Sequence, residues 1–499
     1  MSSKHTEQPL YAVIDLGSNS FHMLITKVVA NSVQTVDKIK RKVRLASGLD
    51  ENNQLDDATI ARGLECLRFF AERLQDIPAS NIRIVATATL RIANNAPAFL
   101  AQAAKILGQE VILLSGQEEA EQIYLGVAHT SCTNGKRLVL DIGGASTEII
   151  VGDGFKPKKV ISLNMGCVTF KQKYFRDNQL TSANFDQAIN AAKSLISPLV
   201  NTYTSIGWNS VLGGSGTMQA LAEILSFNNS PVEINLAFMR NVQQQLIQCK
   251  TIEAIDIPGL EPERTPVIAS GLAILIALFE SLSIEQLQIA SGALREGLLY
   301  EMLPNMRNIP IRERTIGALT IKFNIDHQHA QRVIQQAMFI YQHVEKNWQL
   351  SQDNSFELLK ASCALHEVGV SLAFKNHQQH SAYIVEHADL PGFNFAEKHF
   401  IATLIKQYTG QIRFDELQQQ NVTCIQTISY YLVILRLAII LCRRRRDDVI
   451  PEYQINATKN QLSLCLSKLW LNNHPLIADE LDQERKFLQI IGIDLKLHC

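Results

Sequence analysis

The chain has 499 residues, of which 46% are hydrophobic and 19% charged, and its formal net charge is −1. This size allows about three domains with substantial cores, and the balanced charge excludes a bulk electrostatic attraction to nucleic acids or membranes.

The nine cysteines are odd in number and form no C-x-x-C pair, which argues against a disulfide framework or zinc site and favours a reducing cytoplasm. The N-terminal residues lack the apolar core of a signal peptide. The longest apolar runs, 269–279 and 432–442, are too short to span a bilayer and predict buried helices.

Residues 1–127 predict a lobe built on a mixed sheet with helical crossovers. Apolar side chains recur at helical spacing after Asp56, which is a suitable N-cap. In chain order we predict strands at 10–15, 21–28 and 32–44, a helix at 56–75, a strand at 82–86, a helix at 97–107, a strand at 110–114 and a helix from about Gly116.

One pattern then occurs a second time, 126 residues further along. Each copy is an apolar strand that ends in Asp, a turn of small residues and a second apolar strand. The matched pairs are Asp15 and Asp141, Gly17 and Gly143, and Ser20 and Ser146. Each copy predicts a β-hairpin whose tip presents backbone N–H groups, hydroxyls and one carboxylate, a combination that suits a phosphate chain and its Mg²⁺.

Residues 128–303 repeat the element order of the first lobe. The predicted elements are strands at 137–141, 147–151 and 158–163, a helix at 184–202, a strand at 209–213, a long apolar helix and a strand at 286–290. We therefore expect two similar lobes with a cleft between them. The segment 303–314 is interpreted as a linker, and residues 304–499 as a third, all-helical domain.

Three loops are candidate phosphate-binding segments, because glycine lets backbone N–H groups approach an anion closely. Tight turns without a ligand are the alternative, which a single copy of the pattern would favour. The candidates are Gly17, Ser18, Asn19 and Ser20 in the first hairpin, Gly143, Gly144, Ser146 and Thr147 in the second, and Gly213, Ser215 and Gly216 between a strand and a helix.

The acidic residues near these loops are expected to have three different roles: at a helix start, as a general base and as metal ligands. Glu118 and Glu121 are expected to favour the start of a helix electrostatically. Glu119, if it points into the cleft, can take a proton from a water molecule aimed at a terminal phosphorus. Asp141 and Glu148 lie on one hairpin and can approach the same ion, which predicts an octahedral Mg²⁺ site.

Several cations are candidates for contact with phosphate. Arg91 follows a Thr-Ala-Thr turn and is also expected to act in catalysis by stabilising the charge that develops during phosphoryl transfer. Arg264 and Arg295 flank loops of the second lobe. Lys38, Lys40, Lys42 and Arg44 alternate on one predicted strand, which indicates either a solvated edge or a phosphate track. The run 443–446 predicts a solvated helix end balanced by Asp447 and Asp448, with substrate or subunit binding as the alternative.

The third domain carries histidines that resemble those of HD-type metal phosphohydrolases. They are His329, His366, His377, His380 and His387. The pattern departs at Glu367, where that family has Asp, and at Ile439, where its last metal-binding Asp is expected. We therefore expect a helical scaffold that has kept the fold and lost the metal.

Six segments together resemble the exopolyphosphatase / guanosine pentaphosphate phosphohydrolase family over nearly the whole chain. They are 14–23 (IDLGSNSFHM), 86–91 (ATATLR), 115–120 (SGQEEA), 141–148 (DIGGASTE), 165–168 (MGCV) and 292–297 (GALREG). The resemblance implies two ribonuclease-H-like lobes of the actin, sugar kinase and Hsp70 superfamily, followed by an inactive HD-like helical domain. It also implies a cytoplasmic homodimer.

Within the family, Ala145 and the segments 40–46 and 86–91 favour the members that act on guanosine pentaphosphate (pppGpp). The resemblance then implies Mg²⁺-dependent hydrolysis of the 5′-terminal phosphate to give ppGpp, a starvation alarmone. The first alternative is release of terminal phosphate from inorganic polyphosphate. A kinase of the same superfamily and a nucleotide-binding regulator without catalysis are further alternatives. Nucleic acids and membranes are not expected as partners.

Overall fold

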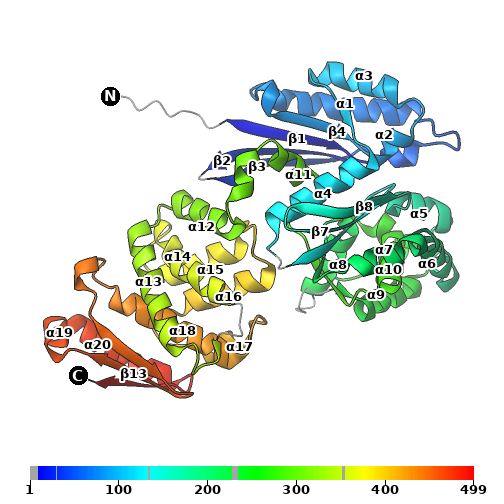
Figure 1. Ribbon diagram of the computed structural model, residues 1–499. Helices are drawn as coiled ribbons and strands as arrows, with labels where there is room; N and C mark the ends of the chain where they lie inside the picture. The colour runs from blue at the N-terminus through cyan, green and yellow to red at the C-terminus, as the bar shows by residue number, and fades with distance from the viewer. Residues whose placement is uncertain (1–8, 30, 133–134, 228–233, 351–354, 499) are drawn as a thin grey trace, which may run out of the picture. The chain divides into compact units, whose positions relative to one another are not determined.

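The computed structural model describes residues 9–29, 31–132, 135–227, 234–350 and 355–498 (Figure 1). The chain divides into two compact units, the first ending at Ile311 and the second beginning at Arg312. The segment predicted as a linker is in part regular structure, because α12 begins at Ile311, inside it, and runs to Lys322. A short 3₁₀ turn, Pro304–Asn308, precedes this helix.

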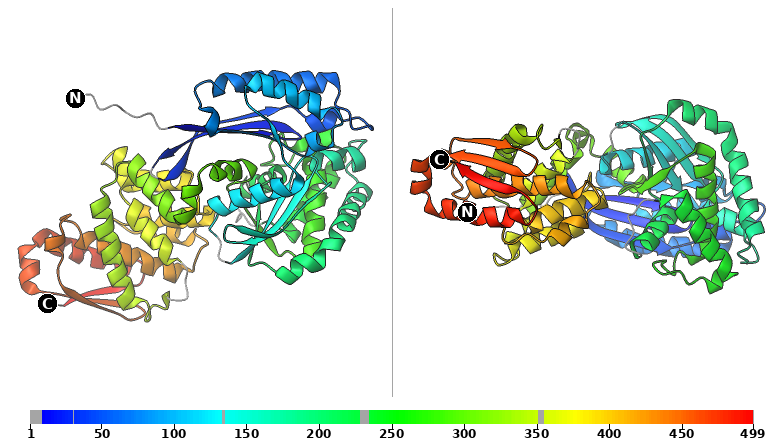
Figure 2. Two further views of the ribbon diagram at one scale, coloured as in Figure 1. Left: turned by 45° about the horizontal axis from the view of Figure 1, so that its top comes forward. Right: turned by 90° about the horizontal axis from the view of Figure 1, so that it is seen from below.

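The first lobe is a five-stranded sheet in the order β3-β2-β1-β4-β5. The first three strands pair antiparallel, and the last two run parallel to β1. Helices α1 and α3 cover one face of this sheet (Figures 1 and 2). The bounds are β1 Leu10–Leu16, β2 Ser20–Val29, β3 Ser32–Lys42, α1 Asp57–Leu74, β4 Ile82–Ala86, α2 Ala88–Ile92, α3 Ala96–Leu107, β5 Ile112–Leu113 and α4 Gly116–Thr130.

The second lobe repeats this strand order as β8-β7-β6-β9-β11 and adds a short strand, β10, at the edge. The common order and the antiparallel second strand confirm the predicted ribonuclease-H-like lobes. The helix predicted at 184–202 is divided in two by a 3₁₀ turn that contains Pro198. The bounds are β6 Lys136–Ile142, β7 Thr147–Asp153, β8 Lys156–Leu163, α5 Cys167–Tyr174, α6 Ser182–Ile196, α7 Val200–Ile206, β9 Ser210–Gly213, α8 Gly216–Phe227, β10 Ile234–Asn235, α9 Leu236–Cys249, α10 Ile268–Leu282, β11 Gln286–Ile289 and α11 Leu294–Glu301.

Helices α4 and α11 join the two lobes. They share a core with residues of both sheets, among them Val13 of β1 and Val139 of β6. The helices pack closely because glycines lie at their contact: a Cβ on Gly126 would stand 2.0 Å from the carbonyl oxygen of Ala293. The expected lobe boundary at 127/128 falls inside α4, which continues to Thr130. The shared core places the ends of both hairpins against one another.

The apolar run 269–279 lies within α10 and is buried, as predicted. Among the described residues, the stretch Thr265–Leu282 is the one helix whose length and composition would allow it to cross a membrane. Its side chains from Ile268 to Phe279 form the centre of the second-lobe core.

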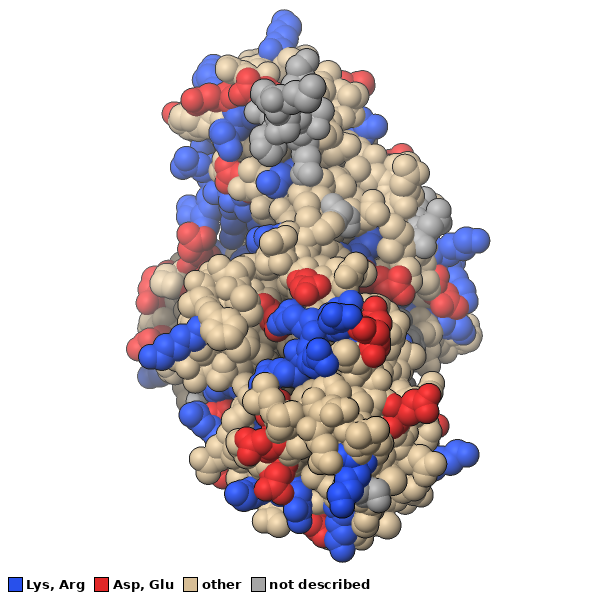
Figure 3. Space-filling model, turned by 90° about the vertical axis from the view of Figure 1, so that its left-hand side faces the viewer, with Lys and Arg blue, Asp and Glu red and all other residues tan. Residues whose placement is uncertain are grey.

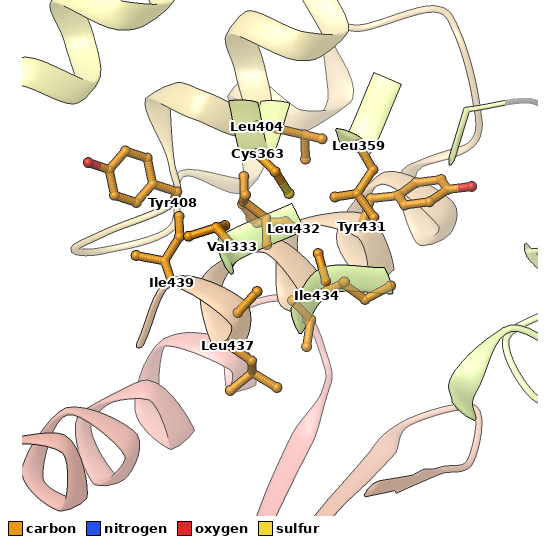
Figure 4. Packing of buried hydrophobic residues seen from close by; sticks show 14 of the residues in the cluster. Val333, Leu359, Cys363, Leu404, Tyr408, Tyr431, Leu432, Ile434, Leu437 and Ile439 are labelled. Carbon is orange, nitrogen blue, oxygen red and sulfur yellow. The ribbon is translucent and has the colours of Figure 1, made fainter. Parts of the chain in front are cut away.

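The second unit begins with helices, as predicted, but its last part contains a three-stranded sheet in the order β12-β13-β14. The expectation of an all-helical domain is wrong for this part, where apolar residues alternate along short strands such as Gln461–Leu466. Part of the large apolar core of the unit is drawn in Figure 4. The bounds are α13 His327–Val344, α14 Phe356–Leu365, α15 His377–His387, α16 Phe395–Lys406, α17 Phe414–Gln418, α18 Ile425–Leu441, β12 Tyr453–Ala457, β13 Gln461–Leu466, α19 Lys468–Asn473, α20 Pro475–Gln489 and β14 Asp494–His498.

Candidate functional site

A cleft of about 370 Å³ lies between the two lobes of the first unit. Most of the residues predicted for phosphate or metal binding line it. They are Gly17, Ser18, Asn19, Ser20, Glu119, Asp141, Gly143, Gly144, Ser146, Glu148, Ser215, Gly216, Arg264 and Arg295.

The two hairpin tips face each other across this cleft. The first tip joins β1 to β2 and the second joins β6 to β7. A Cβ on Gly144 would stand 2.8 Å from Cβ of Ser18, so the small residue permits the close approach of the tips. The N–H of Gly143 donates to the carbonyl oxygen of Ser146 at 2.9 Å, which closes the second turn.

Equivalent positions on the two hairpins carry different chemistry. Strand register places Asp15 opposite His22 in the first hairpin and Asp141 opposite Glu148 in the second. His22 and Glu148 are separated by the same 126 residues as the two aspartates. One lobe therefore presents an imidazole where the other presents a carboxylate.

The carboxylates on the cleft wall have strongly perturbed acidities. Burial raises the pKa of Asp15 to about 7, against the opposing charge of Arg295. Burial also raises the pKa of Asp141 to about 7, and the negative charges of Glu119 and Asp15 add to this effect. For Glu148, burial raises the pKa well above its ordinary value. These carboxylates repel one another, so a bound cation would stabilise their charged forms.

The donor set fits a hard cation such as Mg²⁺. Oδ1 of Asp15 is buried and has no hydrogen-bond partner among the described residues. Oε1 of Glu148 accepts a hydrogen bond from Oγ of Ser162 at 2.7 Å. Carboxylate oxygens from both hairpins, with phosphate oxygens and water, are the ligands that Mg²⁺ prefers.

Glu119 lies in the first turn of α4 and is buried, with 7% of its surface exposed. Its Oε2 accepts a hydrogen bond from Nη1 of Arg91 at 2.6 Å. Burial raises the pKa of Glu119 above its ordinary value, while the charge and hydrogen bond of Arg91 lower it. Glu118 has the capping role that the sequence predicted, because it forms a capping box with Ser115. Glu121 bonds Gln117 one turn away.

Three predicted phosphate ligands do not line the cleft. The Arg91 guanidinium bonds Glu119 and the carbonyl oxygen of Leu114, so it reaches the cleft through Glu119. Thr147 is fully buried, and its hydroxyl donates to the carbonyl oxygen of Met165. Gly213 ends β9 with no space for a side chain, because a Cβ there would meet Sδ of Met218. The latter two positions therefore lie outside the cleft lining.

Positive charge gathers on the other cleft walls. Nη1 of Arg295 lies 3.0 Å from Nδ1 of His22, and Arg264 lies against the start of α8 beside Gly216. Burial lowers the pKa of His22 to about 3, and the charges of Arg295 and Lys40 add to this effect. The neutral imidazole therefore accepts the hydrogen bond from Arg295.

The basic strand contributes one lysine to the cleft. Lys40 pairs with His22 in the β2–β3 register and lines the cleft. The ammonium nitrogens of Lys40 and Lys42 also lie 3.9 and 3.3 Å from Oε2 of Glu263. Arg44 lies beyond the end of β3 in a left-handed conformation, so the prediction that it shares the face of the strand is wrong.

Several cleft residues were not identified as site residues from the sequence. Among them are His22 on the second strand of the first hairpin and Gln219 near the start of α8. The repeat itself signals His22, since its 126-residue offset maps His22 onto Glu148. For Gln219 we find no comparable signal.

The arginine run 443–446 is exposed and lies beside acidic groups, and the predicted pairing with the two aspartates that follow is confirmed for Asp448 but not for Asp447. Arg446 pairs with Asp448, whereas Asp447 pairs with Arg332. The other three arginines contact Glu480, His474, Asp326 and Glu367. On the face of the molecule in Figure 3, a group of basic side chains is likewise bordered by acidic ones. Local charge pairing of this kind produces no extended field of one sign.

Comparison with known proteins gives two family matches and several full-length relatives. Residues 24–306 match the Ppx/GppA phosphatase family, and residues 311–485 match Ppx/GppA phosphatase, domain III. A guanosine-5′-triphosphate,3′-diphosphate pyrophosphatase of Photobacterium profundum is 49% identical over 476 residues, which cover 95% of each chain. The protein of the same name from Vibrio atlanticus is 46% identical over the full length of both chains.

Solved structures show the same fold over part of the chain. The Ppx/GppA family member of Aquifex aeolicus has a TM-score of 0.52 and 23% identity, and covers 60% of this chain and 99% of its own. An exopolyphosphatase of Cytophaga hutchinsonii has a TM-score of 0.54 and 22% identity, with the same coverage. On the evidence of both family matches and of the full-length relatives, the chain belongs to the Ppx/GppA phosphatase family.

Proposed function

We propose that this chain hydrolyses the 5′-terminal phosphate of pppGpp to give ppGpp and phosphate in the cytoplasm. One observation carries the proposal: a buried glutamate, Glu119, lines a cleft in which two hairpin tips face each other and carboxylates and arginines converge. The full-length relatives that are named guanosine-5′-triphosphate,3′-diphosphate pyrophosphatase support this substrate.

In this proposal the tips and the cations hold the oligophosphate. Backbone N–H groups at Gly17–Ser20 and Gly143–Ser146, together with the start of α8, form nests for phosphate oxygens. Arg264, Arg295 and Lys40 supply the charge that such an anion needs. Phosphoryl transfer depends mainly on positioning and electrostatic stabilisation, which these groups supply.

Glu119 is proposed as the general base. Its raised pKa brings the carboxylate closer to the range in which a base works at neutral pH. It accepts the proton of a water molecule that attacks the terminal phosphorus in line with the bond to be broken. Arg91 holds the carboxylate in place from behind, as a positioning residue.

Asp141 and Glu148 are proposed to hold Mg²⁺, with Asp15 facing the same space from the other hairpin. When bound, the ion neutralises charge on the phosphate oxygens. Ser162 orients Glu148 for this role through its hydrogen bond to Oε1.

Exopolyphosphatase activity is the second candidate. The observation that favours it is the row of Lys38, Lys40 and Lys42 on β3, which leads along the strand from the cleft and suits a long anionic chain. The proposed partners are in either case small molecules, and the protein is proposed to act as a homodimer without nucleic acid or membrane partners.

Phosphate release from pppGpp and from long-chain polyphosphate, measured under one set of conditions, tests the proposal. We expect a higher kcat/KM with pppGpp and the appearance of ppGpp as product. A preference for polyphosphate would support the second candidate. Transfer of phosphate to an acceptor would indicate a kinase, and tight binding without phosphate release would indicate a regulator.

A further inference from the structure

A second group of metal-type ligands lies in the C-terminal unit, outside the cleft. His329 is in the first turn of α13, His366 caps the C-terminal end of α14, and Glu367 follows it. One ligand atom from each of the three side chains lies within 4.8 Å of the other two. Both imidazoles are buried, at 3% and 1% exposure, and Glu367 is partly exposed.

One nitrogen of each imidazole has no hydrogen-bond partner among the described residues. Nδ1 of His329 and Nε2 of His366 are both buried, and neither forms a hydrogen bond to any described residue. Nδ1 of His366 lies 2.8 Å from the carbonyl oxygen of Cys363. Because a carbonyl oxygen can only accept, this Nδ1 carries a proton, and the lone pair of Nε2 remains available. Buried polar atoms without partners are rare and call for an explanation, and a shared cation would satisfy both.

The carboxylate is held by an outer partner. Glu367 contacts the guanidinium of Arg445, which also bonds Asp326 at 3.3 Å. Asp326 is the N-cap of α13, and its Oδ1 accepts a hydrogen bond from the backbone N–H of His329. Ligating carboxylates and histidines are commonly oriented by such outer contacts. Glu367 and the backbone of His329 therefore belong to one hydrogen-bond network, which runs through Arg445 and Asp326.

We propose that His329, His366 and Glu367 bind a divalent transition-metal ion such as Zn²⁺. Two imidazole nitrogens and one carboxylate oxygen are a ligand set that suits such an ion and leaves coordination positions open. Ile439 lies among the apolar side chains of the core and offers no ligand (Figure 4), so water or a small molecule completes the shell. The ion links the start of α13 to the end of α14.

This proposal differs from the expectation of a scaffold without metal. That expectation depended on Glu367 in place of Asp and on Ile439 in place of a fourth ligand. Glutamate oxygens bind metals as aspartate oxygens do. The apolar residue reduces the set to three ligands, which is the number that open metal sites use.

Co²⁺ binding to the full-length protein tests the proposal, because Co²⁺ reports its coordination through its visible spectrum. The protein is first treated with chelator and then titrated in excess Mg²⁺, which competes for the oxygen ligands of the cleft. We expect one Co²⁺ per chain with nitrogen ligands, displaced by Zn²⁺. Glu367→Gln and His366→Gln are expected to weaken binding by more than the roughly 10–100-fold that loss of an outer partner causes.

Two controls separate this site from others. His387→Gln removes an exposed histidine and should leave Co²⁺ affinity unchanged, as should Glu148→Gln in the cleft. Thermal unfolding of the metal-free variants checks their fold. Glu367 is partly exposed, so Glu367→Gln is the variant expected to retain the fold. Equal affinity in wild type and Glu367→Gln, or loss of the signal in Glu148→Gln, would overturn the proposal.

Discussion

Nη1 of Arg91 lies 2.6 Å from Oε2 of Glu119, and the same nitrogen donates to the carbonyl oxygen of Leu114 at 2.9 Å. The arginine thereby fixes the orientation of the only glutamate at the start of α4 that lines the cleft. The sequence predicted a direct contact between Arg91 and phosphate, whereas this pairing supports the proposed role of a positioning residue for the base. The two roles differ in what they predict for pH dependence.

We expect Arg91→Gln to move the acid limb of kcat/KM to higher pH. The active form of the base is the deprotonated carboxylate, so activity appears as the pH rises through the pKa of Glu119. Burial raises that pKa, and both effects of Arg91 lower it, so removal of the arginine raises the pKa further. The pH profile of phosphate release at saturating Mg²⁺ measures this shift. Arg91→Lys retains the positive charge and should therefore shift the acid limb less than Arg91→Gln does. An acid limb that stays at the same pH in Arg91→Gln would exclude the positioning role.

Glu119→Gln should reduce kcat by roughly 10²–10⁴-fold, because loss of a general base typically has that cost. Substrate binding should change little, since the amide keeps the shape of the side chain. Steady-state phosphate release gives kcat, and equilibrium binding of substrate gives the affinity. Glu121→Gln is the matched control on the same helix, because Glu121 bonds Gln117 and does not line the cleft. Equal turnover in the two variants would eliminate Glu119 as the base.

Ser162→Ala tests the proposed metal site through its outer partner. The hydroxyl donates to Oε1 of Glu148 at 2.7 Å. Loss of such a partner typically weakens metal binding about 10–100-fold, so the Mg²⁺ concentration for half-maximal activity should rise by that factor. Ser194→Ala is the control, because Ser194 is exposed and its hydroxyl donates to the carbonyl oxygen of Asn190 within α6. An unchanged Mg²⁺ requirement in Ser162→Ala would argue that Glu148 does not hold the ion.

Glu484→Gln should destabilise the C-terminal unit strongly. Arg436 interrupts the apolar run of α18 and is fully buried, with Nε and Nη2 at 2.6 and 2.8 Å from the two oxygens of Glu484. Breaking a buried pair leaves an uncompensated charge, which typically costs about 3–5 kcal/mol in the free energy of unfolding. Denaturant unfolding followed by the fluorescence of Trp348, which stacks on Tyr430 in the same core, measures the loss.

Arg485→Ala is the matched control for this prediction. This substitution breaks the neighbouring ion pair between Arg485 and Asp482, and the side chains of both residues are about half exposed. Exposed pairs typically contribute about 0–1 kcal/mol. Similar midpoints for the two variants would show that the buried pair does not stabilise the unit in the way argued above.

The sequence by itself determined the tandem design and most of the local elements. The repeated strand–turn–strand pattern fixes the hairpins, and local signals such as the N-cap Asp56 and the Ser115–Glu118 capping box fix where helices begin. Such features depend on residues close together in the chain, whose periodicity and capping chemistry are readable in one dimension. The short C-terminal strands were missed because runs of five or six residues carry little periodic signal.

Only the tertiary structure decided which of the candidate side chains work together. It shows that Arg91 bonds Glu119, that Thr147 and Gly213 lie outside the cleft lining, and that His22 lines the cleft. It also brought the two buried histidines of the second unit to within reach of one ion. These contacts join residues from separate elements, and their distances depend on how helices and sheets pack. No local pattern encodes that packing, because it follows from burying many apolar side chains at once.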